Sequence, residues 1–186
     1  MRIVPLVEPY DERTAALLRS MMPAGVAPIG LFRTFAKNYA LAEAMHQGQG
    51  SYLLSRRLTV DMRIREIVID RVCARCGSEY EFGVHAAYFA QRVGLTDDQL
   101  RSLVWGGSDD ACWTDARESA VIRFVDALHD TNDVGDELWT ELTTSFTERQ
   151  LLDLLVLAGW YHAISFVARA ARVPLEDWAP TFMSVR

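Results

Sequence analysis

The sequence has few cysteines, no excess of basic residues and no long uncharged apolar run. Three cysteines are too few, and odd in number, for a disulfide framework, and 186 residues can bury a sufficient core without one. Lys and Arg total 19 against 25 Asp and Glu, so the formal net charge of −6 opposes binding to nucleic acid or to anionic membranes. We therefore expect neither nucleic acid nor a membrane as a partner.

The chain also lacks the features of a secretory signal, because no basic segment precedes an apolar one in residues 1–18. No run of about 18 uncharged apolar residues occurs elsewhere, and a cytoplasmic location is expected by default. Strand-like alternation, repeats and low-complexity tracts are absent. Half of the residues are hydrophobic and 24% are charged, which is typical of a folded chain. The sequence thus predicts a single all-α domain over residues 1–186, arranged as a helical bundle.

Capping signals and the helical spacing of apolar residues predict where the helices lie. Residues 1–10 contain two prolines and are expected to form an extended arm. Helices are expected over 12–21, from 29 to the Gln47–Gly50 break, and over 60–74, 78–93, 96–104, 114–129, 134–146 and 151–171. The expected N-terminal caps are Asp11, Thr59, Ser78 with Glu81, Thr96 with Gln99, and Thr147 with Gln150. Gly77 and Gly94 are the expected stops.

Glu66 is the strongest single candidate for a functional residue. It lies in a helix otherwise devoted to burial, and a buried carboxylate has a raised proton affinity unless it is paired. The apolar residues of this helix share one face, so Arg63, Arg65 and Asp70 are expected to face outward. A salt bridge from Glu66 to either arginine is the structural alternative.

Glu81 and His85 are four residues apart on the next expected helix. The carboxylate can therefore hold the imidazole and set its tautomer, as a proton-transfer histidine requires, although an ordinary pair on a helix face remains the alternative. Antiparallel packing of the two helices would bring Glu66 into the same pocket. The three residues could also bind a metal, but their spacing fits standard zinc and di-iron sites poorly. We expect no metal and no cofactor.

Cys73 and Cys76 are three residues apart, as in redox pairs. Cys76 lies just ahead of the helix expected to begin at Ser78, where the helix dipole favours a thiolate and lowers the thiol pKa. Cys73 ends the preceding helix, where the dipole opposes a thiolate. Cys76 is therefore the expected nucleophile and Cys73 its resolving partner. The alternative is that both are small core residues, a common fate of free cysteine.

The segment 151–171 is apolar nearly all round, which indicates a helix enclosed on every side. In a protein of this size, a helix that is buried on all faces suggests that a neighbouring subunit covers one side of it. His162 within it is expected to hydrogen-bond in the core, and His129, at a helix end, is expected to be structural. Cys112 lies in a loop that is either a plain connector or part of a pocket rim.

The spacing of Glu66, Ser78, Glu81 and His85 resembles the carboxymuconolactone decarboxylase and alkyl hydroperoxidase D superfamily. Redox members of that superfamily carry Glu, eleven residues, and then Cys-x-x-Cys-x-x-x-His. The acid and the histidine match this frame, whereas Ser78 and Glu81 stand at the two cysteine positions. Tyr80 stands where the redox branch has a further histidine.

The resemblance centres on residues 60–130 and implies an all-α bundle that forms a homo-oligomer, preferably a trimer or hexamer, and acts on a small molecule. A peroxiredoxin-type antioxidant oxidoreductase would use Cys76 to attack a hydroperoxide and Cys73 to form a disulfide that a dithiol reductant reopens. Glu66 and His85 would relay protons, with Glu81 and Tyr80 as further site residues.

Two other functions are compatible with the same resemblance. A cofactor-free decarboxylase or isomerase would use His85 and an acid to transfer protons on a small carboxylated lactone, without any cysteine. A non-catalytic oligomeric binding protein would keep the fold and lack the chemistry.

Overall fold

The computed structural model describes all of residues 1–186, and every regular element in it is a helix. The all-α fold predicted from the sequence is confirmed. The elements are α1 (Glu12–Ser20), α2 (Gly30–Phe35), α3 (Tyr39–Gln47), α4 (Gln49–Leu53), α5 (Met62–Arg75), α6 (Glu79–His85), the π-helical turn η1 (Ala86–Ala90), the 3₁₀ turn η2 (Gln91–Val93), α7 (Asp97–Trp105), α8 (Ala116–Thr131), α9 (Asp136–Ser145), α10 (Glu148–Ala171) and the 3₁₀ turn η3 (Phe182–Val185).

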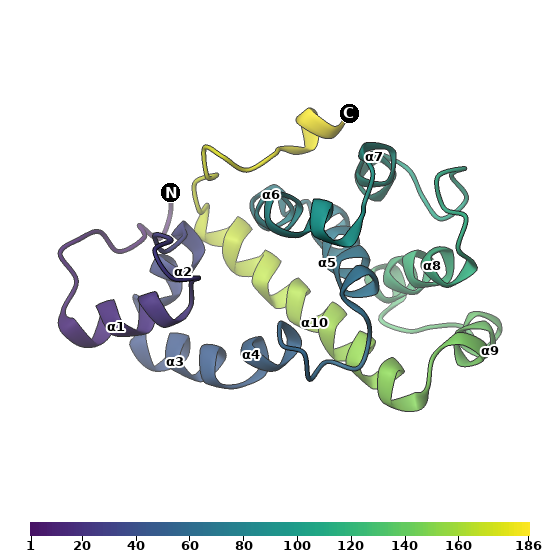
Figure 1. Cartoon of the computed structure of the whole chain (residues 1–186), viewed down its shortest axis with the longest axis horizontal. Coiled ribbons are helices and arrows are strands. Elements are labelled where there is room, and N and C mark those ends of the chain that lie inside the picture. Colours follow the sequence, from purple (N-terminus) through teal and green to yellow (C-terminus); the bar gives the residue numbers. More distant parts are fainter.

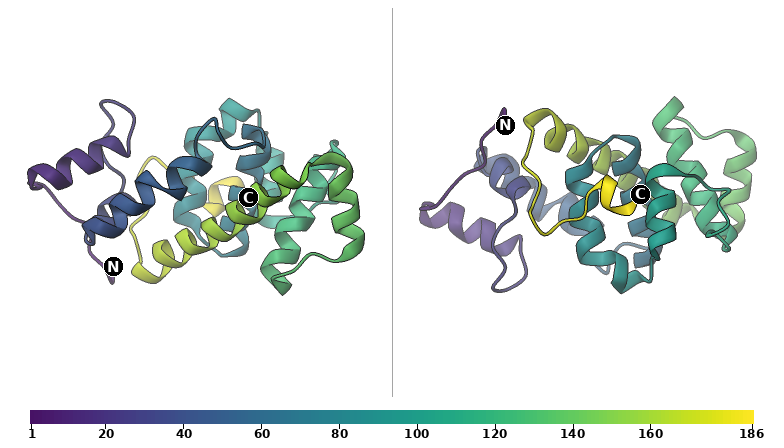
Figure 2. Two further views of the ribbon diagram at one scale, coloured as in Figure 1. Left: turned by 90° about the horizontal axis from the view of Figure 1, so that it is seen from below. Right: turned by 90° about the horizontal axis from the view of Figure 1, so that it is seen from above.

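Helix α5 lies at the centre of the molecule and packs against α6, α7, α8 and α10 (Figure 1). Helices α1 to α4 form one end of the protein and α8 and α9 the other, while α10 runs diagonally between them. The views from below and above show the same division (Figure 2). The C-terminal segment crosses back over α6 and α7, where Phe182 N–H donates to Glu79 Oε1 at 2.8 Å and Phe182 O accepts from Trp105 Nε1 at 3.1 Å.

Helix α5 has no outward-facing charged side. Arg65 is 4% exposed and Asp70 only 1%, so the expectation that they face solvent is wrong. Arg63 is partly buried and its guanidinium binds Glu118 of α8 at 2.5 Å. The sequence places apolar residues on one side of α5, but α7 and α8 cover the opposite side as well. The buried charged groups of α5, namely Arg65, Glu66, Asp70 and Arg71, are therefore removed from water, and each costs free energy unless it has a partner.

The N-terminal cap of α5 is Asp61, not Thr59 as expected. Asp61 Oδ1 accepts from Ile64 N–H at 2.9 Å, as a capping carboxylate does. Thr59 instead donates its hydroxyl to Asp153 Oδ2 of α10 at 2.6 Å. A tertiary contact thus uses the side chain that local sequence reasoning assigned to the cap.

The long helix expected from residue 29 to the Gln47–Gly50 break is two helices. The chain leaves the helix at Ala36, and Asn38 caps a new one by accepting from Leu41 N–H at 3.2 Å. Apolar spacing continues through this break, which is why periodicity alone does not show it. Gly48 ends α3, and the short α4 follows at once.

The helix stops expected at Gly77 and Gly94 are confirmed. Both glycines are left-handed, with φ of 63° and 68°. After α5, Gly77 N–H donates to Ala74 O at 2.9 Å and Ser78 N–H donates to Cys73 O at 2.7 Å, the two bonds of a Schellman motif. The chain therefore reverses within two residues and begins α6.

The capping boxes expected at Thr96 and Thr147 both form. The box expected at Ser78 does not, because the Ser78 hydroxyl is buried without a partner and Glu81 points elsewhere. The N-terminal arm lies along the body, with Arg2 and Ile3 N–H donating to Ala171 O and Leu6 N–H donating to Arg33 O.

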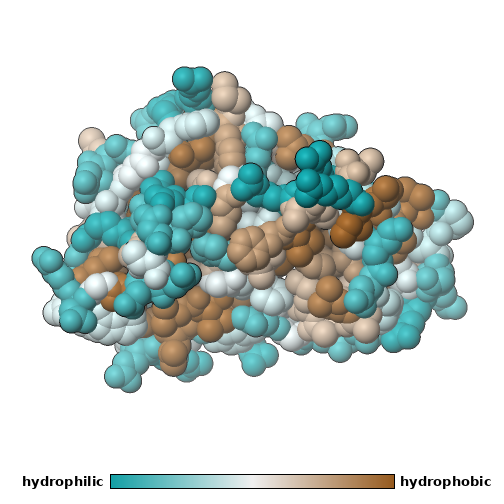
Figure 3. All heavy atoms as spheres, turned by 180° about the vertical axis from the view of Figure 1, so that it is seen from behind, coloured by the Kyte–Doolittle hydropathy of each residue, from teal (hydrophilic) through white to brown (hydrophobic).

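Helix α10 is the only element long and apolar enough to cross a membrane by length and composition, but half of its most apolar window is buried in the protein, as in the core helix of a soluble protein. It is not enclosed on every side in the single chain. Leu152, Val156 and Phe166 are 63%, 43% and 66% exposed. Apolar surface also occurs in several patches among charged side chains on the face shown in Figure 3.

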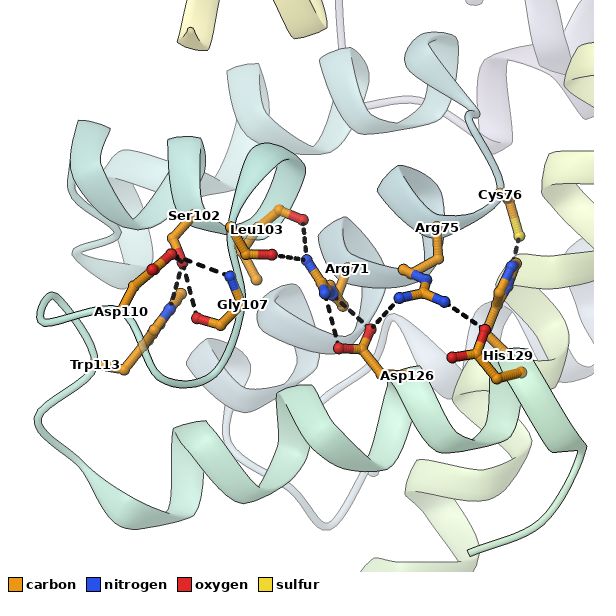
Figure 4. Close-up of polar contacts among 12 residues, drawn as sticks. Arg71, Arg75, Cys76, Ser102, Leu103, Gly107, Asp110, Trp113, Asp126 and His129 are labelled. Atoms are coloured by element: carbon orange, nitrogen blue, oxygen red, sulfur yellow. Dashed lines mark hydrogen bonds and ion pairs between the residues drawn. The ribbon is translucent and has the colours of Figure 1, made fainter.

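Arg71 holds three elements together (Figure 4). Its guanidinium binds both oxygens of Asp126 in α8 at 2.7 Å, and it donates to Leu103 O and Gly106 O, the end of α7, at 2.9 and 3.0 Å. Arg71 is 5% exposed, so these partners replace its hydration. The C-terminal carbonyls of α7 are satisfied by the same group.

Replacing Arg71 is expected to destabilise the protein strongly. In Arg71→Leu two carbonyl groups lose their partner and the Asp126 carboxylate keeps only Arg75 at 3.4 Å, and we expect a loss of about 3 kcal/mol in the free energy of unfolding. Arg123→Leu removes an exposed pair with Glu141 and should cost less than about 1 kcal/mol. Urea unfolding measures both, and equal losses in the two variants would contradict the role given to Arg71.

Candidate functional site

The hairpin of α5 and α6 brings Glu66 and His85 together. His85 Nδ1 lies 2.7 Å from Glu66 Oε2, and both side chains are buried, at 0% and 4% exposure. Because a carboxylate only accepts, Nδ1 carries the hydrogen. The sequence predicted that these two residues share a site, and the geometry agrees.

Three further groups complete the cluster. The Tyr161 hydroxyl of α10 lies 3.0 Å from His85 Nε2, with its ring edge-on to the imidazole, and Glu81 Oε1 lies 3.5 Å from the same nitrogen. Arg65 Nε donates to the second oxygen of Glu66 at 2.6 Å. Glu66 is thus held from both sides, and His85 has a partner on each ring nitrogen.

The charges of this cluster set the pKa of His85. Burial alone lowers it, but the negative charge of Glu66 and the hydrogen bonds from Glu66 and Glu81 outweigh burial and raise the pKa to about 10. His85 is therefore an imidazolium at neutral pH. Burial and the charges of Glu81 and Glu66 raise the pKa of Tyr161, which stays a neutral phenol.

A pocket of about 490 Å³ opens onto this cluster. Its walls come from the loop after α1 and from α2, α3, α4, α6, η1 and α10 and are mainly apolar; among them are Leu31, Phe35, Met45, Tyr88, Trp160 and Ile164. Glu81, His85 and Tyr161 supply its polar atoms at the end nearest α5. The chain turns from α-helix to π-helix directly after His85, a feature that often marks functional sites. The π turn places Tyr88 and Phe89 in the wall next to His85.

Glu81 has an unused acceptor at this position. Its Oε2 is buried and has no hydrogen-bond partner, although Glu81 lines the pocket. The sequence assigned this residue to a helix cap, which the structure shows to be wrong. A buried carboxylate oxygen without a partner, on a residue that lines a pocket, is suited to accept a hydrogen bond or a proton from a ligand.

The two cysteines of the central stretch lie outside the pocket. Cys73 is fully buried between helices, and burial together with nearby Glu81 raises its thiol pKa well above the usual value. Cys76 is the C-terminal cap of α5, and burial raises its pKa too, despite the lowering effect of Ser165, Arg169 and Arg75. The expectation that the helix dipole lowers the pKa of Cys76 is therefore wrong. Desolvation outweighs a dipole effect of at most ~1 kcal/mol at an exposed site.

Tyr80 is turned away from His85. Its hydroxyl donates to Glu176 Oε1 at 2.7 Å and accepts from Leu31 N–H at 2.9 Å. Glu176 Oε1 also accepts from Gly30 N–H at 2.6 Å, so Tyr80 links α6 to the start of α2 and to the C-terminal segment. Burial and the bond to Glu176 raise its pKa.

The only group of side chains with the composition of a metal site lies elsewhere. Cys76, His129 and His162 bring a sulfur and two ring nitrogens within 4.8 Å of one another. Cys112, the third cysteine, lies beside α7, where its sulfur is 3.8 Å from Asp98 O, and it belongs neither to the pocket nor to the group of Cys76, His129 and His162.

Comparison with solved structures shows the same arrangement of helices in other proteins. An uncharacterised peroxidase-related protein from Silicibacter sp. superposes with a TM-score of 0.81 at 16% identity, over 100% of this chain and 97% of its own. A protein of unknown function from Agrobacterium tumefaciens, assigned provisionally as the antioxidant defence protein AhpD, has a TM-score of 0.66 at 16% identity, over 76% and 95% of the two chains. The chain has the AhpD-like fold.

A third protein with this fold is the debrominase Bmp8. A cysteine-to-alanine variant of Bmp8 in complex with 2,3,4-tribromopyrrole has a TM-score of 0.78 at 14% identity, over 96% of this chain and 93% of its own. No protein-family model matches the sequence, and neither does any curated protein. The resemblance to the AhpD-like superfamily predicted from the sequence is confirmed at the level of the fold.

Within this AhpD-like fold, the site contains residues that the sequence did not single out. Tyr161 comes from α10, and its position in an apolar segment gave no signal of a polar role. Arg65 was expected on the surface. Asp70 lies one turn from Glu66, and burial and the charge of Glu66 raise its pKa well above the usual value. Only an i, i+4 spacing of acids on a buried helix could have drawn attention to it.

The raised pKa of His85 predicts a specific pH dependence of stability. The folded state binds this proton more tightly than the unfolded chain, so the stabilisation is complete below pH 6.5 and is lost as the pH rises through about 10. Between pH 7 and 10 we expect the wild type to lose on the order of a few kcal/mol more than His85→Asn, as measured by urea unfolding. His46→Asn, at the pocket rim, should keep the wild-type profile. Parallel profiles for wild type and His85→Asn would refute the charged state of His85.

Proposed function

We propose that this protein is an enzyme that transfers protons on a small substrate held between Glu81 and His85. The observation that supports this most directly is the floor of the pocket. It carries an unpartnered carboxylate oxygen of Glu81 beside an imidazolium, and no thiol. A carboxylate base and a cationic donor next to each other are the groups that acid–base catalysis at carbon requires.

The roles follow from the hydrogen bonds. Glu66 fixes the ring of His85 through Nδ1 and stabilises its charge, while Nε2–H donates to the Tyr161 hydroxyl at 3.0 Å. Glu81 Oε2 accepts a proton from the substrate. Tyr161, bonded to Nε2, can pass a proton between His85 and the bound molecule. Arg65 keeps Glu66 in place and does not line the pocket.

A small carboxylated lactone is the substrate class that we favour. Loss of CO₂ from such a molecule leaves an electron pair on carbon, delocalised into the conjugated carbonyl, and a proton from His85 then completes the product. Isomerisation needs only removal of a proton by Glu81 and its return at another carbon. Arg92 lies at the pocket lining and can attract the carboxylate. Bmp8, which shares the fold, binds a small flat heteroaromatic molecule, and this supports a similarly flat ligand here.

A thiol peroxidase of the AhpD type is the second candidate. In that reaction Cys76 sulfur attacks the peroxide, which breaks the O–O bond and leaves a sulfenic acid and an alcohol or water. Cys73 would displace water to form a disulfide, and a dithiol would reduce it. The nearness of Cys76 to Arg169 and Arg75, which lower its pKa, favours this candidate. Complete burial of Cys73 and the absence of thiols from the pocket oppose it.

Two substitutions separate the candidates. Glu81→Gln keeps the shape of the side chain and removes the base, so turnover of carboxymuconolactone should fall at least ~100-fold, as expected for loss of a general base. Cys76→Ser should leave that turnover unchanged. Lactone loss is followed by absorbance and peroxide consumption is followed with a dithiol present, after circular dichroism has shown that each variant is folded. Peroxide turnover abolished by Cys76→Ser and kept by Glu81→Gln would overturn the proton-transfer proposal.

We also propose that the protein is a homo-oligomer, with α10 at the interface. The exposed residues Leu152, Val156, Gly159, Ala163 and Phe166 recur every three or four positions and form one stripe along α10. Such a stripe is the seam of paired helices, and Gly159 has open space where a side chain would begin. A second copy would bury the apolar face that the single chain leaves exposed.

A charge in the stripe is expected to break the oligomer. Val156→Lys places an ammonium in the middle of the proposed seam, whereas Leu41→Lys places one at an equally exposed apolar position in α3. Sedimentation equilibrium at micromolar concentration should show a multiple of the 21.0 kDa chain mass for wild type and Leu41→Lys, and a reduced mass for Val156→Lys. A monomeric wild type would contradict the proposal.

A further inference from the structure

Three metal-ligating side chains converge away from the pocket. Cys76 comes from the end of α5, His129 from the last turn of α8 and His162 from the middle of α10. His129 Nδ1 lies 3.1 Å from His162 Nε2 and 4.0 Å from Cys76 Sγ, and Figure 4 shows the sulfur aimed at the His129 ring. We propose that these three side chains form a zinc site.

The distances suit one metal ion bound to all three atoms. Tetrahedral Zn²⁺ with bonds of about 2.0–2.1 Å to nitrogen and about 2.3 Å to sulfur places two nitrogens about 3.3 Å apart and nitrogen and sulfur about 3.6 Å apart. The observed 3.1 and 4.0 Å differ from these values by a few tenths of an ångström. Small side-chain rotations would therefore be enough to bind the ion.

The tautomer of His162 is already the one that a metal needs. Its Nδ1 lies 2.9 Å from Ala158 O, and because a carbonyl only accepts, Nδ1 carries the hydrogen. Nε2 is then left with a free lone pair directed at the cluster. A ligating histidine that donates its other N–H to a backbone carbonyl is the usual arrangement in metal sites, since this bond orients the ring.

The set of ligands selects the type of metal. A thiolate and two imidazoles suit zinc, whereas Ca²⁺ and Mg²⁺ need oxygen ligands, which this site does not offer. Three protein ligands leave a fourth position for water or another small ligand. Binding displaces the thiol proton of Cys76, while the Nδ1 proton of His129 moves to Nε2, so one proton is released for each ion bound.

The surrounding charges do not exclude a cation. Arg75 is the nearest cationic side chain on α5, but it is paired with Asp126 at 3.4 Å and with Asp130. Arg169 donates to Cys76 O at 2.5 Å, which fixes the backbone beneath the sulfur. The two histidines are only partly buried, so an ion can reach them from solvent.

This site is separate from the proposed proton-transfer centre. None of its three ligands lines the pocket, and none contacts Glu66, Glu81 or His85 by a hydrogen bond. It joins the ends of α5 and α8 to α10, so a bound ion would link three helices. Sequence reasoning considered a metal at Glu66, Glu81 and His85, and it did not combine Cys76 with His129 and His162, which are far apart in the chain.

Cobalt substitution tests the site directly. Chelator-treated protein titrated with Co²⁺ should develop visible d–d bands of tetrahedral cobalt and a near-ultraviolet thiolate charge-transfer band, at one ion per chain. Zn²⁺ should displace the cobalt and abolish both. The Cys76→Ser variant should lose the charge-transfer band. By calorimetry, Cys76→Ser and His162→Gln should each weaken Zn²⁺ binding at least ~10-fold. The control variant Cys112→Ser should bind Zn²⁺ as the wild type does. A cobalt spectrum without the thiolate band would overturn the proposal.

Thiol labelling gives a second test that needs no substitution. Iodoacetamide treatment with and without Zn²⁺, followed by peptide mass spectrometry, should show at least ~10-fold slower labelling of Cys76 in the presence of zinc, because a metal-bound thiolate is shielded. Cys112 in the same molecule is the control and should label equally under both conditions. Equal rates at Cys76 with and without zinc would contradict a zinc site.

Discussion

The burial of α5 on every side is the constraint on which the rest of the structure depends. A helix that is enclosed by four others cannot hydrate its charged side chains, and an unpaired charge in such a place costs several kcal/mol. Most charged residues of α5 therefore have a specific partner from another element or from their own turn, whereas Asp70 is buried and its Oδ1 has no hydrogen-bond partner. Arg71 binds Asp126 and the end of α7, and Glu66 binds Arg65 and His85. These pairs decide how α6, α7 and α8 sit on the central helix.

The candidate site is a consequence of the same pairing. Because Glu66 is buried and charged, it keeps a proton on His85 that the apolar surroundings would otherwise remove. The cation then faces a mainly apolar pocket, with Glu81 and Tyr161 as the polar groups beside it. Cys76, next to the turn at Gly77, does not line this pocket and lies beside His129 and His162 instead. One hairpin thus carries the Glu66–His85 cluster beside the pocket and, at its turn, a candidate metal site.

The sequence predicted correctly what depends on a few neighbouring residues. The stops at Gly77 and Gly94 and the caps at Thr96 and Thr147 are local, because backbone dihedrals and short-range hydrogen bonds decide them. It was wrong where a distant element uses the same side chain. Thr59 binds Asp153 instead of capping α5, and Arg65 faces inward because other helices cover its side of α5. The lowered pKa expected for Cys76 failed for the same reason, since burial by other helices outweighs the dipole of its own.

The sequence by itself determined the all-helical class and most helix ends, because capping residues and glycine stops act over a few neighbouring residues; the shared pocket of Glu66 and His85 was a hypothesis that depended on antiparallel packing of their helices. Only the tertiary structure decided that Tyr161 contacts His85, that one oxygen of Glu81 has no partner, and that Cys76 meets His129 and His162. Those contacts join residues of different helices across the fold. Desolvation and side-chain packing between distant elements, which no local pattern in the chain encodes, determine where such residues meet.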